Sequence, residues 1–168
     1  MSRCMLNSSE HGRQTPDKQL IGIVADSHGQ AESLADGLAF LRKQGCDTRY
    51  HLGDICDSLH PETADTCVGL LLEFEVNCVK GNNDHAVVVN HGGRKSASVH
   101  VDTVDYLRGL PLVIEFPKSL LAHSLPFERE LGLACMVGAM TREYALDFFR
   151  KFNDRFLFRG HSHTPGII

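Results

Sequence analysis

The sequence predicts an α/β fold built on a largely parallel sheet, and three observations favour this class. Short apolar runs alternate with stretches of helical periodicity over residues 20–80. Polar residues that can bind ligands follow the predicted strands directly. Leu, Ile, Val and Phe make up 47 of the 168 residues, which exceeds the share of roughly one fifth that a folded core requires. The length is that of one domain.

The first three elements are a strand, a helix and a strand. Residues 20–25 form a nearly all-apolar run, which is typical of a buried strand. Apolar residues then recur at helical spacing over residues 31–41, and Gly45 is a stop signal for that helix. Residues 49–52 predict the second strand.

The next two elements repeat the alternation. Pro61 marks a helix start, and an apolar stripe at helical spacing runs through residues 64–72. Residues 75–80 predict the third strand. Because helices separate the three strands, we expect the strands to be parallel and the helices to pack on the sheet.

The second half of the chain has a weaker pattern. Residues 99–104 fit either a strand or a helix start, and residues 113–116 and 120–122 predict a hairpin. Thr141 is a suitable N-cap for a following amphipathic helix. Residues 155–159 predict the last strand.

Composition narrows the possible environments and partners. Residues 1–19 are polar without periodicity, so we expect a mobile lead-in followed by one domain over residues 20–168. The apolar runs are shorter than the ~18 residues of a membrane span, which predicts a cytoplasmic protein without membrane contact. A net charge of −4 gives no general attraction for nucleic acid, and six scattered cysteines indicate reduced thiols.

Polar motifs follow five of the predicted strands. Ligands gather at the carboxyl ends of strands in α/β sheets, so we expect these motifs to meet. The motifs are Asp26-Ser27-His28, Gly53-Asp54, Gly81-Asn82-Asn83-Asp84, His123 and Gly160-His161-Ser162-His163.

Their chemistry suits a metal centre. The pairs Asp26/His28 and His161/His163 alternate by two, so in an extended segment both side chains of a pair can face one centre. Three of the motifs begin with a glycine directly before a candidate ligand, and glycine permits a tight turn and lets the backbone approach an ion closely. A mixture of carboxylate, imidazole and amide oxygen favours Mn, Fe, Zn or Ni over Ca or Mg. His51, inside the second strand, is interpreted as a half-buried structural residue.

This series of motifs resembles the calcineurin-like metallophosphoesterases and, among them, is most similar to the small bacterial and archaeal phosphodiesterases of the YfcE type. The resemblance covers residues 20–165. It implies a four-layer α/β/β/α sandwich with two metal ions. By position, the resemblance implies one ion on Asp26, His28, Asp54 and His163, and a second on Asp54, Asn82, His123 and His161, with Asp54 bridging.

The sequence departs from the family at several positions. Many members have His where this chain has Asn83, and Asn cannot protonate a leaving group. We include Asn83, Asp84 and His85 with Asp54 among the catalytic candidates, and His85 is the first alternative for facing the substrate. Relatives continue through further strands after the last motif, whereas this chain ends at residue 168. We therefore expect a sheet that lacks its C-terminal strands, with an edge that a second copy could cover in a homodimer.

The expected function is that of a two-metal phosphoesterase acting on a small phosphate ester. A hydroxide between two divalent ions, Mn being the first choice, would attack phosphorus in line. Ser58-Leu59 follows Asp57, and Lys80 precedes Gly81, where the related phosphoprotein phosphatases carry arginines. A phosphodiesterase is therefore favoured over a protein phosphatase. The alternatives are a binding scaffold on the same fold and, less favoured by the charge, a nuclease.

Overall fold

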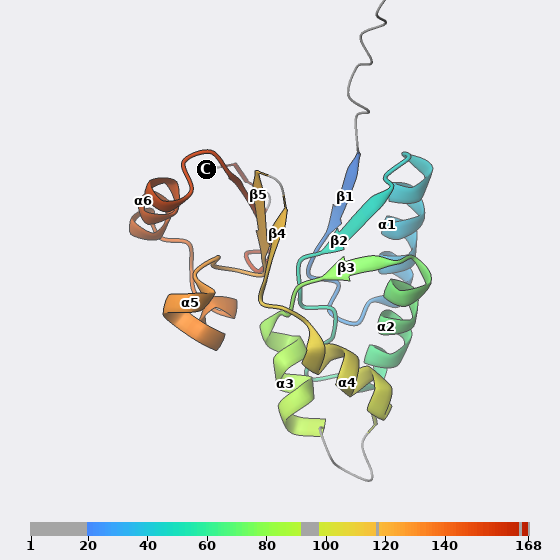
Figure 1. Ribbon diagram of the computed structural model, residues 1–168. Coiled ribbons are helices and arrows are strands. Elements are labelled where there is room, and N and C mark those ends of the chain that lie inside the picture. Colours follow the sequence, from blue (N-terminus) through green and yellow to red (C-terminus); the bar gives the residue numbers. More distant parts are fainter. Residues whose placement is uncertain (1–19, 92–97, 117, 165, 168) are drawn as a thin grey trace, which may run out of the picture.

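Two three-stranded sheets lie face to face in the computed structural model, which describes residues 20–91, 98–116, 118–164 and 166–167 (Figure 1). In the first sheet all strands are parallel, in the order β1 (Ile21–Val24), β2 (Thr48–His51) and β3 (Val76–Cys78). In the second sheet β5 is antiparallel to β4 and parallel to β6; these strands are β4 (Val113–Phe116), β5 (Ser119–Ala122) and β6 (Phe156–Arg159).

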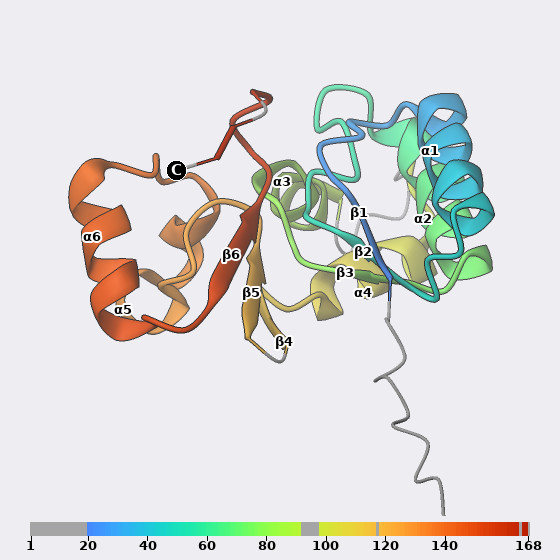
Figure 2. The ribbon, with the colours of Figure 1, turned by 90° about the horizontal axis from the view of Figure 1, so that it is seen from above.

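Helices cover the outer faces of both sheets (Figures 1 and 2). On the first sheet these are α1 (Ala31–Lys43) and α2 (Ala64–Glu73), the latter preceded by a 3-10 turn at Pro61–Thr63. On the second they are α5 (Glu128–Leu131), the 3-10 helix Gly132–Met136 and α6 (Arg142–Lys151). Two further helices, α3 (Asn82–His91) and α4 (Val101–Gly109), lie in the sequence between the last strand of the first sheet and the first strand of the second. The predicted four-layer α/β/β/α arrangement is confirmed.

Three apolar clusters hold the layers together. Leu38 and Leu71, both fully buried, join α1 and α2 over the first sheet. Tyr50 and Leu121 meet in the cluster between the two sheets. Phe148 of α6 belongs to the cluster on the outer face of the second sheet. Since full burial of each large apolar side chain contributes about 1.5–3 kcal/mol, these contacts fix the positions of the strand ends that carry the polar motifs.

Several local predictions are settled by the structure. The three parallel strands, the hairpin and the last strand are confirmed. Residues 99–104, which fitted either class, begin a helix, with the His100 side chain accepting a hydrogen bond from the Asp102 N–H. Thr141 caps α6 by accepting from the Tyr144 N–H at 3.2 Å. The predicted lead-in at residues 1–19, Pro117 and the final residue 168 lie outside the described residues.

Helix α3 is an addition to the predicted elements. Its first residues, Asn82 and Asn83, have modest helix propensity, and three consecutive valines obscure the helical period. Burial of Val87 in the same cluster as Leu107 of α4 stabilises the helix by tertiary contact. Within the described part of the chain, none of the helices combines the length and apolarity needed to cross a membrane.

Candidate metal centre

The loops after β1 and β2 run side by side and extend the pairing of their strands. The Asp26 N–H donates to the Gly53 carbonyl at 3.1 Å, and the His28 N–H donates to the Asp54 carbonyl at 2.9 Å. These bonds continue the register in which Val24 pairs with His51. The first two motifs are therefore fixed relative to each other by main-chain hydrogen bonds.

Asp26 also joins the two sheets. The main-chain N–H of His161 donates to both carboxylate oxygens of Asp26, at 3.0 Å each. The Gly160 N–H donates to the His123 carbonyl at 3.0 Å, so the loop after β6 is tied to the loop after β5. The loops after β1, β5 and β6 thus meet at one place between the sheets.

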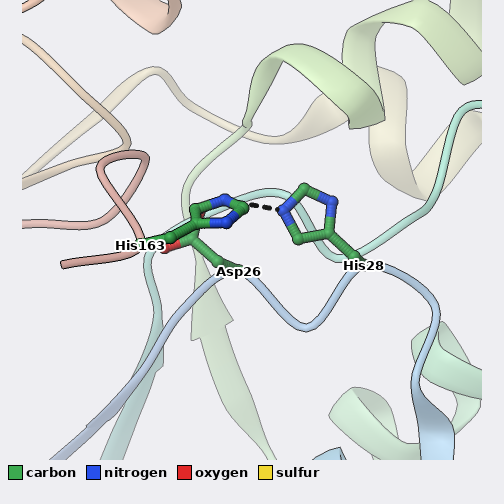
Figure 3. A group of neighbouring side chains, drawn as sticks. All are labelled: Asp26, His28 and His163. Atoms are coloured by element: carbon green, nitrogen blue, oxygen red, sulfur yellow. Dashed lines mark hydrogen bonds and ion pairs between the residues drawn. The ribbon is translucent and has the colours of Figure 1, made fainter.

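A first group of side chains consists of Asp26, His28 and His163 (Figure 3). The Nε2 atoms of the two imidazoles are 3.0 Å apart, and His163 Nε2 lies 3.8 Å from Asp26 Oδ1. Asp26 and His28 are half-buried, whereas His163 is exposed. This group lies at the open side of the centre.

A second, more buried group consists of Asp54, His123 and His161. The Nε2 atom of His123 lies 3.1 Å from His161 Nδ1, 3.5 Å from Asp54 Oδ2 and 3.1 Å from Asn82 Oδ1. Its other ring nitrogen, Nδ1, is 2.8 Å from the Leu52 carbonyl oxygen. Because a carbonyl can only accept, Nδ1 carries the proton, and in the neutral ring Nε2 is left with a lone pair facing the group.

Asp54 belongs to the second group and also faces the first. Its Oδ2 atom is 3.7 Å from His28 Nε2 of the first group and 3.5 Å from His123 Nε2 of the second. The side chain is 2 % exposed. One carboxylate oxygen therefore faces nitrogen ligands from both groups.

The backbone is unusual at these positions. Seven non-glycine residues in the described chain have positive φ, and five of them belong to the two groups: Asp26, His28, Asp54, His161 and His163. Asp and His tolerate this region better than most residues, yet such conformations persist only where surrounding contacts impose them. The concentration of positive φ angles at these residues is typical of a site in which the fold determines the orientation of the side chains.

Two glycines allow the loops to approach each other. A Cβ at Gly81 would collide with the main-chain nitrogen and Oδ1 of Asp54, and a Cβ at Gly160 would lie 2.8 Å from Asp26 Oδ2. Gly53 has φ of +85°, and a Cβ there would lie 2.7 Å from the Gly81 nitrogen. These glycines therefore permit the close approach of the loops to one another.

Comparisons with known proteins agree with this geometry. Residues 20–168 match the calcineurin-like phosphoesterase superfamily domain. The chain belongs to this superfamily. A metallophosphoesterase from Sphaerobacter thermophilus is 23 % identical with a TM-score of 0.63, covering 88 % of this chain and 62 % of that one.

A second solved structure, a candidate diadenosine tetraphosphatase, is 28 % identical with a TM-score of 0.50, covering 66 % of this chain and 52 % of that one. This chain therefore spans between half and two thirds of the length of the two solved structures. A search of curated proteins found no match.

The donor set fits the divalent metals that this superfamily binds. Bonds of about 2.0–2.1 Å from imidazole nitrogen to a transition metal place neighbouring nitrogens about 3.0–3.4 Å apart. The His28–His163 and His123–His161 nitrogen pairs, at 3.0 and 3.1 Å, have that spacing. Carboxylate and imidazole together suit first-row transition metals. Both groups are therefore candidate sites for a divalent metal.

Electrostatics keep Asp54 ionised in the metal-free protein. Burial raises its pKa, but the hydrogen bond with His123 and those from Asn83 more than offset this and hold the pKa at about 2. For His123 burial lowers the pKa, and the Asp54 carboxylate outweighs burial, so the net pKa is raised. The pKa of His161 is lowered by burial and by His123. A metal ion at this group would replace the proton of His123 as the positive charge beside Asp54.

The remaining predicted residues have distinct surroundings. Asp84 is fully buried, and its carboxylate accepts from the N–H groups of Cys56 and Gly81 at 3.0 and 2.9 Å. Its pKa is raised by burial, which these bonds oppose. These contacts make Asp84 a residue that positions two loops, and its catalytic role stays a prediction. His85 is half-buried on α3.

His51 is more important to the site than its sequence position indicated. It is fully buried, its Nδ1 accepts from the Gly53 N–H at 3.2 Å, and its Nε2 lies 2.9 Å from the Ser27 hydroxyl. That hydroxyl donates to the Ile55 carbonyl at 3.2 Å, so His51 Nε2 is the donor to Ser27. His51 thus links the loops after β1 and β2 as a neutral ring, and burial holds its pKa at about 3.

A pocket of about 360 Å³ opens beside the first group. Its lining includes Asp26, His28 and His163. Residues from the end of β1 and the start of α1 also line it, among them apolar Val24 and Leu34 and polar Gln30 and Ser33. The candidate metal ligands therefore face a space large enough for a small organic group.

Proposed function

We propose that the protein is a two-metal-dependent phosphodiesterase. The observation that carries this proposal is the position of Asp54, which belongs to one group of Asp and His side chains and faces a histidine of the other. We assign Asp26, His28, Asp54 and His163 to one ion and Asp54, Asn82, His123 and His161 to the other. We expect Mn in both positions.

The chemistry divides between the ions and the chain. Two bound divalent cations would polarise the phosphoryl oxygens and supply hydroxide from water at neutral pH. The chain orients the ligands: the Leu52 carbonyl fixes the His123 tautomer, and the His161 N–H fixes Asp26. The nucleophile comes from water, so the reaction does not require a Ser or Cys nucleophile.

Charge around the site favours a diester over a monoester dianion. Lys80 is 9 % exposed, and its ammonium donates to the Arg108 carbonyl at 2.7 Å, which holds it in place. Arg108 itself is paired with Asp105. Neither Lys80 nor Arg108 therefore serves as a bidentate clamp for the second charge of a phosphomonoester, which supports a diester substrate.

The pocket beside the first group supplies a place for one ester group. Its apolar wall, Val24 and Leu34, and its polar rim, Gln30 and Ser33, suit a ring system that carries hydrogen-bonding groups. The similar candidate diadenosine tetraphosphatase is named for a molecule in which phosphates join two nucleosides. A substrate with organic groups on both sides of its phosphate fits both observations.

The test is a comparison of esters on protein that has been stripped of metal and reloaded with Mn²⁺. Bis(4-nitrophenyl) phosphate should be hydrolysed at least tenfold faster than 4-nitrophenyl phosphate at equal concentration. The Asp54→Asn variant should lose turnover of both esters while keeping its far-ultraviolet circular dichroism. Preference for the monoester would contradict a diesterase, and metal binding without turnover of either ester would indicate the scaffold alternative.

A further inference from the structure

Asn83 occupies the position from which many relatives present a histidine, and in this chain its side chain turns to Asp54. Its main-chain N–H donates to Asp54 Oδ1 at 2.8 Å, and its side-chain Nδ2 donates to Asp54 Oδ2, also at 2.8 Å. One residue thus binds both oxygens of the carboxylate that lies between the two ligand groups.

Ser58 determines which way the Asn83 amide faces. The Ser58 hydroxyl donates to Asn83 Oδ1 at 2.7 Å, and the Ser58 N–H approaches the same oxygen at 3.3 Å. Since two donors point at one end of the amide, that end must be the oxygen. The amino end is then directed at Asp54. Ser58 lies in the loop after the second motif and Asn83 is the second residue of α3, so the pair also joins this loop to the helix.

These bonds restrict the orientation of the Asp54 carboxylate but leave lone pairs on both of its oxygens. A carboxylate has about four lone-pair directions, and Asn83 uses one on each oxygen. One direction on each oxygen is left, and Oδ2 faces His28 and His123. Free rotation of Asp54 about its side-chain bonds would break both Asn83 bonds, so the plane of the carboxylate is held before any ligand binds.

We propose that Ser58 and Asn83 form a positioning pair that fixes the Asp54 carboxylate for metal binding. The proposal deepens the function proposed above and rests on it. Ser58 acts through Asn83 and is not among the assigned metal ligands. Groups that orient a ligand in this way typically change metal affinity by about 10–100-fold when they are removed.

The first measurement is Mn²⁺ affinity by calorimetric titration of metal-free protein. Ser58→Ala should weaken binding by about 10-fold or more, whereas Ser58→Thr, which keeps the hydroxyl, should restore most of the wild-type affinity. Ser98→Ala is the matched control, because Ser98 is exposed and remote in sequence from the motifs. It should bind as wild type does. Equal affinity of Ser58→Ala and wild type would overturn the proposal.

The second measurement needs no metal. The side-chain NH₂ signals of Asn83 in the metal-free protein should be shifted and slow to exchange, and Ser58→Ala should move them towards the free-amide position. Unchanged signals in Ser58→Ala would overturn the pair. If wild type itself binds no Mn²⁺, the two-metal function fails, and these amide signals alone decide whether Ser58 orients Asn83.

Discussion

Replacing Gly81 with alanine tests how closely the second and third motifs must approach. The added Cβ would meet the main-chain nitrogen and the Oδ1 of Asp54, and it would lie 2.9 Å from the Asp54 Cα. An ordinary contact needs at least 3.4 Å, and the Asp54 nitrogen and Oδ1 would lie closer than the Cα, so the loops must separate by more than about 1 Å. Because most of these neighbours are main-chain atoms, the collision cannot be relieved by a change of rotamer.

The expected cost follows from that collision. Overpacking of this kind destabilises proteins by about 1–3 kcal/mol, which lowers the midpoint of thermal unfolding by about 3–10 °C in a chain of this size. A shift of about 1 Å at a ligand also exceeds the roughly 0.5 Å that a metal site tolerates, so Mn²⁺ affinity should fall by about 10-fold or more. Both quantities can be measured on one preparation by scanning and titration calorimetry.

Gly69→Ala is the matched control. Gly69 lies within α2, and a Cβ there would meet nothing within 4 Å. Alanine should stabilise this helix by about 0.5–1 kcal/mol and leave Mn²⁺ affinity unchanged. The reasoning would be refuted if Gly81→Ala unfolded at the wild-type temperature and bound Mn²⁺ as tightly.

Three further predictions concern pH, a helix cap and the leaving group. The pKa of His51 is about 3 in the fold, held down by burial and by His123, against 6.5 when unfolded. The His51 ring is neutral in both states above about pH 6.5. Below that pH the unfolded chain binds a proton that the folded chain does not, so the free energy of unfolding decreases as the pH is lowered. Metal-free wild type should lose about 2 kcal/mol more than His51→Gln between pH 7 and pH 5 in urea titrations, and parallel pH profiles would contradict this. Thr141→Ala should cost about 1 kcal/mol without changing Mn²⁺ affinity, as a melting curve and a titration would show. Asn83 cannot donate a proton as an acid, so the Mn²⁺-loaded enzyme should cleave activated aryl diesters at least about 100-fold faster than alkyl diesters. Similar rates for the two classes would indicate another general acid, and His85 would be the first residue to mutate.

The sequence predicted those parts of the fold in which local pattern and tertiary packing agree. The strand around Ile23 is a short apolar segment, and the strand around Tyr50 lies between two clear helical stripes, so the positions of both could be predicted from the sequence. Helix α3 was not predicted, because its asparagines and valines have weak helix propensity and its stability comes from packing of Val87. The parallel pairing of β5 with β6 depends on contacts between distant segments, which periodicity does not encode.

At the site, the sequence predicted which motifs meet but not how each side chain is oriented. The positive φ at Asp26 and His161 is imposed by hydrogen bonds between loops, and a residue type only permits it. The same holds for Asn83, whose contact with Asp54 depends on the distant Ser58. His51 resembled an ordinary core residue because its role depends on partners from two separate loops.

The most direct test of the account is the number of Mn²⁺ ions that the active protein requires. Metal-free protein should be titrated with Mn²⁺ while bound metal, by elemental analysis after desalting, and hydrolysis of bis(4-nitrophenyl) phosphate are followed together. We predict that activity rises until two ions are bound per chain, and that Asp54→Asn neither retains two ions nor turns over the ester. Full activity with one ion per chain, or with none, would contradict the two-metal centre built around Asp54.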